Sequence, residues 1–213
     1  MPEDIIHRIL GQARNLFLRY GVRSVTMDEV VQQLGMSKKT LYQHFANKAD
    51  IVLAVVRGYL QEQKEQSDRI SAEAENAIDQ EFRLLLWAVQ VFRDMNPSLI
   101  FEVQKYFPQA WEEFDAFKNG YLREKVHQNL IRGVEEGLYR PELDLELISY
   151  VRLAQVDISI TQEELPPGKY AFSQVTLVLF DLYLRGIVTA QGREMLEAYL
   201  EQIDEVNLTQ VDA

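Results

Sequence analysis

Several absences limit what this 213-residue chain can be. It has no cysteine, so disulfide bonds and thiolate chemistry are excluded. It lacks the uninterrupted run of about eighteen apolar residues that a membrane-spanning helix needs, and no membrane partner is expected. The N-terminus, MPEDIIHRIL, is acidic and has no cationic segment followed by an apolar one, which argues against a secretory signal. Together these absences predict a cytoplasmic protein.

Residue patterns typical of enzymes are also missing. The three histidines, His7, His44 and His127, are widely spaced, and none stands in a Glu-x-x-His or His-Glu-x-x-His pattern. The chain has no glycine-rich phosphate loop and no nucleophile elbow. We therefore expect no metal, no cofactor and no catalytic residues. An enzyme built on a helical scaffold remains the alternative interpretation.

An excess of positive charge is lacking as well, since the formal net charge is −11. The charge is unevenly distributed, however. Residues 1–60 hold 8 basic and 5 acidic residues, a net charge of +3, whereas residues 61–213 hold 14 basic and 28 acidic residues, a net charge of −14. An acidic remainder would repel DNA and orient the basic end toward it.

The strongest local signals lie in the stretch TMDEVVQQLGMSKKTLYQHF, residues 26–45. Thr26, with Glu29 three residues later, predicts a capping box at the start of a helix. Gly35 predicts the end of that helix, because glycine accepts the left-handed conformation. Ser37 can cap a second helix of about two turns, which is too short to be stable alone. The stretch therefore predicts two short helices joined by a tight turn.

The second of these helices has a polar and basic outer face. Leu41 and Phe45 are its expected buried pair, and the outward residues are Lys38, Lys39, Thr40, Tyr42, Gln43 and His44. Lys38 and Lys39 lie in the first turn, where the helix dipole disfavours each cation by about 0.3–1 kcal/mol. A polyanion at this end would remove the conflict, as in a helix-turn-helix that inserts its second helix into the major groove. A solvated surface explains the lysine pair alone equally well.

Residues 5–57, including ILGQARNLFLRYGVRSVTMDEVVQQLGMSKKTLYQHFANKADIVLAVV, resemble the DNA-binding domain of the tetracycline-repressor (TetR) family of bacterial transcriptional regulators. The resemblance implies an all-α fold with a helix-turn-helix DNA-binding domain and connecting helix over residues 1–66. A helical effector-binding and dimerisation domain would follow over residues 67–213. It further implies a homodimeric repressor that binds a palindromic operator in double-stranded DNA and is released by a small-molecule effector. A helix-turn-helix used only for protein contacts is a further alternative.

The same face supplies the candidate DNA-binding residues. Base edges are expected to be read by Lys38, Lys39, Thr40 and Gln43, and phosphates to be contacted by Thr26, Ser37, Tyr42, His44 and Lys48. By resemblance, Thr26, Tyr42, His44 and Lys48 match positions that commonly contact the DNA backbone in the family. Lys39 departs from the family pattern, in which a small residue is frequent, so both a base edge and a phosphate remain open as its partner. Tyr42 as a ring closing the small core, and His44 as a plain surface residue, also stay open.

The rest of the chain has helical periodicity throughout. The expected helices are Asp4–Tyr20, Asn47 to about Gln66, Asn76–Met95, Pro97–Tyr106, about Pro108–Tyr139, residues 143–160, Tyr170–Arg185 and Gln191–Glu205. The segment VTLVLFDLYL, residues 175–184, has the composition of a buried strand. No partner strand is visible elsewhere in the sequence, so we expect a helix there.

The resemblance implies an effector pocket and a dimer interface beyond residue 66. The pocket candidates are Trp87, Phe92, Phe101, Tyr106, Trp111, Phe114, Tyr121 and Asp157; each is also compatible with an ordinary core position. Arg83, Glu102 and Arg152 also lie in apolar sequence surroundings, where they could orient a ligand, form buried ion pairs or face solvent. TetR-like proteins dimerise through their last two long helices, which gives the interface candidates Phe172, Val175, Leu179, Tyr183, Leu196, Tyr199, Leu200 and Ile203.

Overall fold

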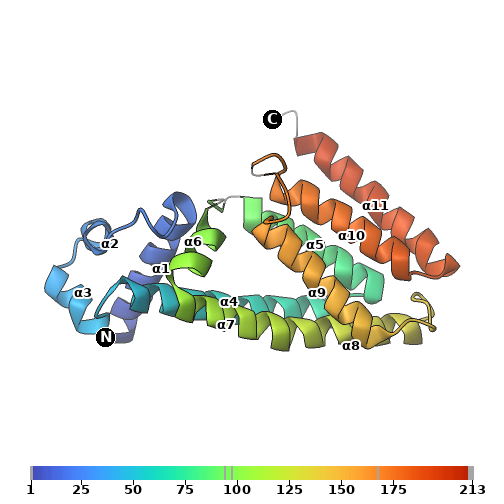
Figure 1. Ribbon diagram of the computed structural model, residues 1–213, viewed down its shortest axis with the longest axis horizontal. Coiled ribbons are helices and arrows are strands. Elements are labelled where there is room, and N and C mark those ends of the chain that lie inside the picture. Colours follow the sequence, from blue (N-terminus) through green and yellow to red (C-terminus); the bar gives the residue numbers. More distant parts are fainter. Residues whose placement is uncertain (1, 94, 97, 167, 211–213) are drawn as a thin grey trace. The chain divides into compact units, whose positions relative to one another are not determined.

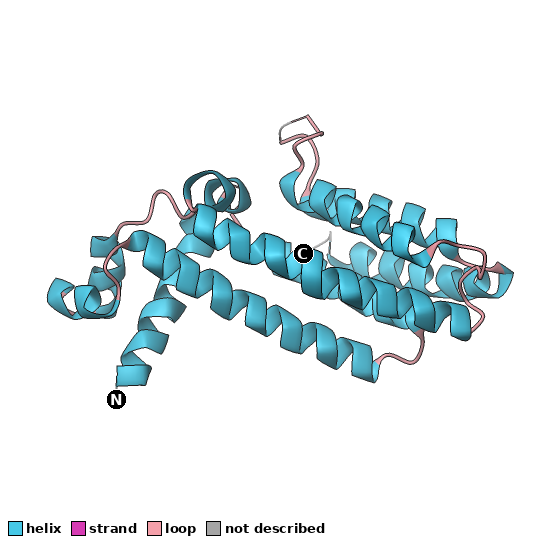
Figure 2. Cartoon of the chain, turned by 60° about the horizontal axis from the view of Figure 1, so that its bottom comes forward, coloured by secondary structure: helices cyan, strands magenta, loops and turns pink. Residues whose placement is uncertain are grey.

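The computed structural model describes residues 2–210 except 94, 97 and 167, with side chains described between residues 4 and 201. Within this part of the chain the elements are helical, as Figure 2 shows, which confirms the all-α prediction. They are α1 (Pro2–Tyr20), α2 (Met27–Leu34), α3 (Lys38–His44), α4 (Lys48–Glu73), α5 (Ala77–Arg93), α6 (Leu99–Tyr106), α7 (Pro108–Phe117), the π-helical turn η1 (Lys118–Leu122), α8 (Arg123–Glu135), α9 (Leu145–Thr161), α10 (Phe172–Ile187) and α11 (Ala190–Gln210) (Figure 1). The segment 175–184 lies inside α10.

The chain divides into two compact units. Unit 1 comprises Met1–Glu65 and Arg93–Lys118, and unit 2 comprises Gln66–Phe92 and Asn119–Ala213. The segment that contains α6 and α7 therefore packs with the helix-turn-helix end of the chain, although α5 of unit 2 precedes it in sequence. The division of function at residue 66 stays a prediction, because compact packing and function are separate properties.

The core of unit 1 joins the helix-turn-helix to α1, α4 and α7. Its buried members are Ile9, Ala13, Phe17, Val22, Val25, Val30, Val31, Leu41, Phe45, Ile51, Val52 and Ala110. The predicted buried pair is confirmed, since Leu41 is 0% exposed and Phe45 is 8% exposed. Burial of this apolar set supplies the free energy that such short helices cannot obtain from their own hydrogen bonds.

The core of unit 2 gathers apolar residues from α5, α8, α10 and α11, among them Phe82, Leu130, Phe180 and Leu196. A glycine makes one of its close contacts possible. A Cβ added to Gly133 would lie 2.0 Å from the ring of Tyr139. That tyrosine is fully buried, and its hydroxyl donates to Asn129 Oδ1 at 3.1 Å while Asn129 Nδ2 donates to the carbonyl of Ala77 at 2.9 Å. The hydrogen-bonded chain thus ties α5 to α8 inside the core.

Two of the predicted helices show the largest differences from the structure. The single helix expected from Pro108 to Tyr139 is interrupted by the π-helical turn η1 and ends at Glu135, before Gly137 with its φ of 74°. The helix expected to end near Gln66 continues to Glu73. Ser67 and Ile70 are buried along this extension. Packing on this side of α4 therefore stabilises the helix beyond Gln66, although the sequence there is mostly polar.

Candidate nucleic-acid interface

Helix α2 begins with a complete capping box. The Thr26 hydroxyl accepts from the Glu29 amide at 3.2 Å, and the Glu29 carboxylate accepts from the Thr26 amide at 2.6 Å. These hydrogen bonds hold the pKa of Glu29 below its usual range. The helix ends at Gly35, whose φ of 62° is the left-handed conformation that the sequence predicts.

Helix α3 is fixed from both sides although it has only seven residues. The Ser37 hydroxyl accepts from the Thr40 amide at 3.1 Å and lies 2.8 Å from the Thr40 hydroxyl. Beneath the helix, Leu41 is fully buried in the core of unit 1. Because one side is capped and the other is packed, the outward side chains project from a rigid support.

The outward face of α3 is open to solvent, with Ser37, Lys38, Lys39, Tyr42 and Gln43 exposed. Thr26 is exposed as well, whereas Thr40, His44 and Lys48 are half-buried. The ring of Tyr42 is 50% exposed, which disfavours the alternative that it closes the small core. The predicted DNA-binding residues therefore form one surface of unit 1, and their contacts with DNA stay a prediction.

Sequence reasoning missed a carboxylate on this surface. Asp28 lies in the first turn of α2, and its Oδ2 atom accepts from Lys38 Nζ at 2.7 Å across the turn. This hydrogen bond raises the pKa of Lys38 above its usual range. Asp28 is ten positions from Lys38, so no helical spacing signals the contact; only the folded turn brings the two residues together.

Lys48, one of the expected phosphate ligands, already has partners inside unit 1. Its Nζ atom donates to the carbonyl of Arg23 at 3.1 Å and lies 6.0 Å from the centre of the Phe107 ring. Burial lowers the pKa of Lys48, although the charges of Glu102 and Glu29 oppose the shift. The ammonium group thus holds the loop before α2, and only its other donors are available to a phosphate.

Helix α6 closes the same loop from the other side. The Glu102 carboxylate accepts from the Arg23 amide at 2.7 Å and from the Ser98 hydroxyl at 3.1 Å. Gly21, with a φ of 79°, leaves room for this contact, because an added Cβ would lie 2.9 Å from the Glu102 carboxylate. The backbone N–H of Asn96, just before α6, donates to the carbonyl of Leu18 in α1 at 2.8 Å. Asn96 and Glu102 thus hold the end of α1 and the loop that follows it.

The expected effector-lining residues are divided between the units. Unit 1 contains Phe101, Tyr106, Trp111 and Phe114, and unit 2 contains Trp87, Phe92, Tyr121 and Asp157. Two of them lie at the surface: Phe101 and Tyr106 are 52% and 41% exposed on α6, and Lys105 Nζ lies 5.1 Å and 5.5 Å from their ring centres. Aromatic rings in apolar sequence surroundings can be held at a surface by such cations. The role of Phe101 and Tyr106 in effector binding stays a prediction.

In unit 2 the candidates have different environments. The ring of Phe92 stacks on that of Phe172 with centres 4.1 Å apart, whereas the Tyr121 hydroxyl donates to Asp68 at 2.9 Å. Trp87 and Asp157 are half-buried. A role in effector binding for these unit 2 residues stays a prediction.

The expected dimer-interface residues also differ in their environments, and their role in dimerisation stays a prediction. Tyr183 and Leu196 are 5% and 0% exposed and belong to the core of unit 2, so they have no surface to offer a partner. Leu200 and Tyr199 pack against the same core, and Phe172, Val175 and Leu179 are half-buried. Ile203 lies outside the residues whose side chains are described. An apolar helix can face a core or a partner, and composition alone does not separate the two.

Comparisons with known proteins identify the family. Residues 9–55 match the model of the bacterial regulatory proteins of the tetR family. The uncharacterized helix-turn-helix (HTH)-type transcriptional regulator YvaF of Bacillus subtilis is 31% identical over 140 residues, which span 62% of this chain and 73% of YvaF.

Solved structures show the same fold. The ketosteroid transcriptional regulator KstR2 of Mycobacterium tuberculosis is 21% identical, with a TM-score of 0.60 over 86% of this chain and 95% of KstR2. The transcriptional regulator FadR of Bacillus subtilis, solved with stearoyl-CoA, is 17% identical, with a TM-score of 0.65 over 85% of this chain and 98% of FadR.

No helix in the described part of the chain is both long and apolar enough to cross a membrane. Three findings agree with one another. Helix α3 is capped and exposed, residues 9–55 match the family model, and the match to YvaF covers many more residues than the helix-turn-helix. The chain belongs to the TetR family of bacterial regulatory proteins and is a DNA-binding transcriptional regulator.

Proposed function

We propose that this regulator is a cytoplasmic homodimeric repressor that binds a palindromic operator and is released by a small-molecule effector. The observation that carries the DNA-binding part is α3, a short helix fixed by caps and core with a basic, polar and exposed outer face. Two such helices related by a two-fold axis fit successive major grooves of a palindrome.

Within this proposal the outward residues have two roles. Lys38, Lys39, Thr40 and Gln43 read base edges, since lysine donates to guanine and glutamine pairs with adenine. Thr26, Ser37, Tyr42, His44 and Lys48 contact phosphates and set the position of the helix in the groove. The exposure of most of these side chains supports this division.

The surface that best suits a second copy of the chain lies on α9 and α10, which pack against each other in unit 2. Its exposed apolar members are Leu147, Tyr150, Val151, Val178 and Leu182, each between 45% and 61% exposed. Among the residues of α11 whose side chains are described, up to Glu201, the exposed ones include the charged Arg193, Glu194 and Glu197. A contiguous apolar surface marks an interaction site more often than a charged one does, so we assign the dimer interface to α9 and α10.

Buried polar atoms in unit 2 support an effector site there. Tyr183 Oη, Gln155 Oε1 and Thr176 Oγ1 are buried on α9 and α10 and have no hydrogen-bond partner within the described residues. Such a group costs about 1–3 kcal/mol. The guanidinium of Arg152 lies 4.6 Å from the ring centre of Tyr183 and 3.5 Å from the carboxylate of Glu81. A ligand with hydrogen-bonding groups would satisfy these atoms.

Release from the operator follows from linkage between the two sites. An effector weakens operator binding only if it binds more tightly to the geometry that does not fit the operator. FadR, whose structure holds stearoyl-CoA, shares the fold, which supports a small-molecule effector without naming it. The curated relatives are described as transcriptional regulators, and this supports the regulator over the helical-scaffold enzyme.

The test selects duplexes for the purified protein from random oligonucleotides and sequences them. We expect a palindrome, and an affinity that falls steeply with salt because bound phosphates release counterions. Tyr42→Ala and Gln43→Ala should weaken binding by about tenfold each without lowering the melting temperature. Lys169→Ala, an exposed residue of unit 2, is the matched control. Recovery of no palindrome, or a flat salt response, would contradict the proposal.

The interface has its own test by sedimentation. Leu182→Glu places a charge in the apolar surface and should convert the dimer to monomer, whereas Glu194→Gln on α11 should leave the dimer intact. The opposite pattern would move the interface to α11.

A further inference from the structure

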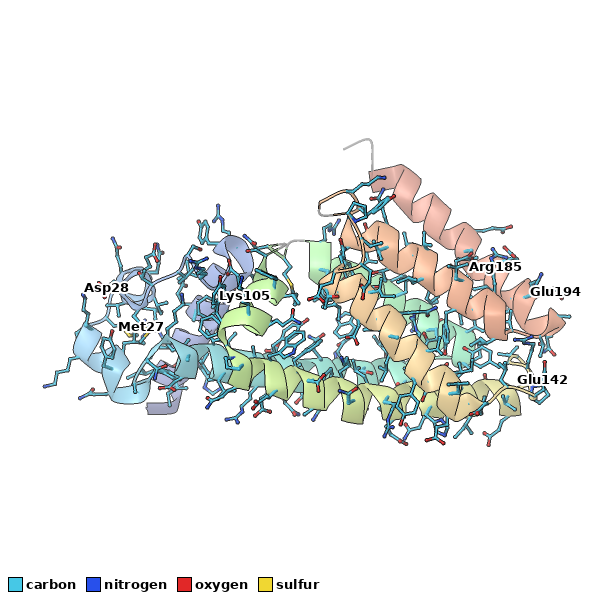
Figure 3. The ribbon with its side chains drawn as sticks, in the orientation of Figure 1. Met27, Asp28, Lys105, Glu142, Arg185 and Glu194 are labelled. Atoms are coloured by element: carbon cyan, nitrogen blue, oxygen red, sulfur yellow. The ribbon has the colours of Figure 1, made fainter. Side chains whose placement is uncertain are left out.

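Asp28 is an acidic residue on the predicted DNA-binding surface, where it pairs with Lys38. Asp28 and Lys38 have side chains that are 62% and 64% exposed, and their charged atoms are 2.7 Å apart. Figure 3 shows Asp28 on α2, at the end of unit 1 that carries the predicted DNA-binding residues. A carboxylate here faces the polyanion that the surface is proposed to bind.

The fold does not depend on this carboxylate. Thr26 and Glu29 already satisfy the start of α2 through the capping box. An ion pair as exposed as this one contributes little to stability, because water screens it and both side chains lose freedom. The acid in the first turn also complements the helix dipole, but Glu29 occupies the same turn. Structural reasons for Asp28 are therefore weak.

We propose that Asp28 is a specificity-determining residue that competes with DNA phosphates for Lys38. This inference rests on the proposed operator binding. On a non-operator duplex, a phosphate that approaches Lys38 also approaches Asp28, whose carboxylate is 2.7 Å from the ammonium group, so the two negative charges repel each other and compete for the same ammonium group. The carboxylate therefore weakens binding to DNA that offers no matching base.

On the operator the same carboxylate is compatible with binding. The Lys38 ammonium has three donors, and one of them is used by Asp28. The others can reach the O6 and N7 acceptors of a guanine while Asp28 stays in place, which also limits the directions in which Lys38 can point. Asp28 has a second oxygen that can accept from a cytosine amino group. The pair thus favours a base edge over a phosphate.

Asp28→Asn in the full-length protein tests the proposal, because it removes the charge and keeps the shape. Binding is measured by fluorescence anisotropy on the selected operator and on a scrambled duplex of equal length, over a series of salt concentrations. We expect affinity for the scrambled duplex to rise about three- to tenfold, with its salt slope steeper by about 0.9 as one more phosphate is engaged. Operator affinity should change by less than about threefold, so the ratio between the two duplexes falls.

Two controls separate this mechanism from a general charge effect. Glu112→Gln removes one exposed negative charge from α7 of the same unit and should leave the ratio unchanged. In a Lys38→Ala background, Asp28→Asn should lose its effect on the ratio, as a double-mutant cycle requires for residues that act through each other. Melting temperatures confirm that each variant is folded.

The outcomes distinguish this inference from the proposed function. If the wild type selects no palindrome, the proposed function fails and the inference falls with it. If the wild type binds its operator but Asp28→Asn raises both affinities by equal factors, only the inference fails. An unchanged ratio, or an effect that persists without Lys38, also overturns it.

Discussion

Polar side chains in the two units differ in their exposure and in their hydrogen bonding. In the helix-turn-helix of unit 1 they are exposed and have nearby partners, as in the Thr26–Glu29 box and the Ser37 cap. In unit 2, Tyr183, Gln155 and Thr176 present buried atoms without a protein partner. The first arrangement suits a rigid surface whose shape is set before DNA arrives. The second leaves hydrogen-bonding capacity inside the protein, where a small molecule can use it.

The chain provides a probe for each side of this comparison. Its two tryptophans are Trp111 on α7 of unit 1 and Trp87 on α5 of unit 2. Replacing either one by phenylalanine leaves a single tryptophan, whose emission can be excited selectively, so unfolding of each unit can be followed separately. Variants can then be ranked by which unit they affect and by how much.

The largest effect is expected for Leu41→Ala. Leu41 is fully buried beneath α3, and such truncations cost about 2–5 kcal/mol because a cavity remains. The Trp111 transition should move to lower denaturant and operator binding should be lost, while the Trp87 transition stays. Equal shifts of both transitions would show that the units unfold together and would break the comparison.

Gly133→Ala should destabilise unit 2 and leave the stability of unit 1 unchanged. The new methyl group would overlap the Tyr139 ring, and overpacking of this kind costs about 1–3 kcal/mol. The Trp87 transition should shift and the Trp111 transition should not. Gly120→Ala, where an added Cβ meets nothing within 4 Å, is the control, and a shift of similar size there would argue against the ring contact as the cause.

Thr26→Ala removes the cap of α2 and should cost about 1 kcal/mol. The loss should appear in the Trp111 transition and in faster amide exchange at the start of α2, with weaker operator binding as that end frays. Thr26→Ser keeps the hydroxyl and should restore most of the stability. If serine proves no better than alanine, the hydrogen bond to Glu29 is not what stabilises this end.

The smallest effect is a pH dependence of opposite sign in the two units. Hydrogen bonds from Thr26 lower the pKa of Glu29, so its stabilising contribution is present above the usual glutamate pKa and is lost as pH falls through the lowered value. Burial raises the pKa of Glu81 despite Arg152. Its contribution therefore improves as pH falls through the raised value, because the charge no longer has to be buried.

Thermal denaturation of Glu29→Gln and Glu81→Gln between about pH 7 and pH 4 measures both contributions. As pH falls, wild type should lose stability relative to Glu29→Gln, and gain stability relative to Glu81→Gln. Differences that run in the same direction would show that the two carboxyl groups do not have opposite pKa shifts.

The local structure of the helix-turn-helix was predictable because its signals are local. Thr26, Gly35 and Ser37 each form their capping hydrogen bonds with groups within four residues, so the spacing can be read from the sequence. The ion pair between Asp28 and Lys38 was not predictable, because it depends on how the turn aims two side chains.

In both units, the division of apolar side chains between core and surface was harder to predict, for a different reason. Tyr183 and Leu196 read as interface residues because an apolar helix suits either a partner or a core, and the packing of neighbouring helices decides between them. Phe101 and Tyr106 read as pocket residues, yet Lys105 beside them shares an exposed position on α6. The burial of a side chain depends on the whole fold, so local sequence patterns do not predict it.

The contacts that Asn96 and Glu102 make with the end of α1 and the loop after it constrain how this protein can be divided by engineering. Ending a fragment after α4 would strip the Leu18 carbonyl and the Arg23 amide of their partners and remove Ala110 from the hydrophobic core. A DNA-binding unit that can be transferred to another protein would instead need both chain segments of unit 1, with junctions near residues 65, 93 and 118. In chimaeras that exchange only the first 66 residues between relatives, the two chain segments of unit 1 would come from different proteins and would not be matched to each other.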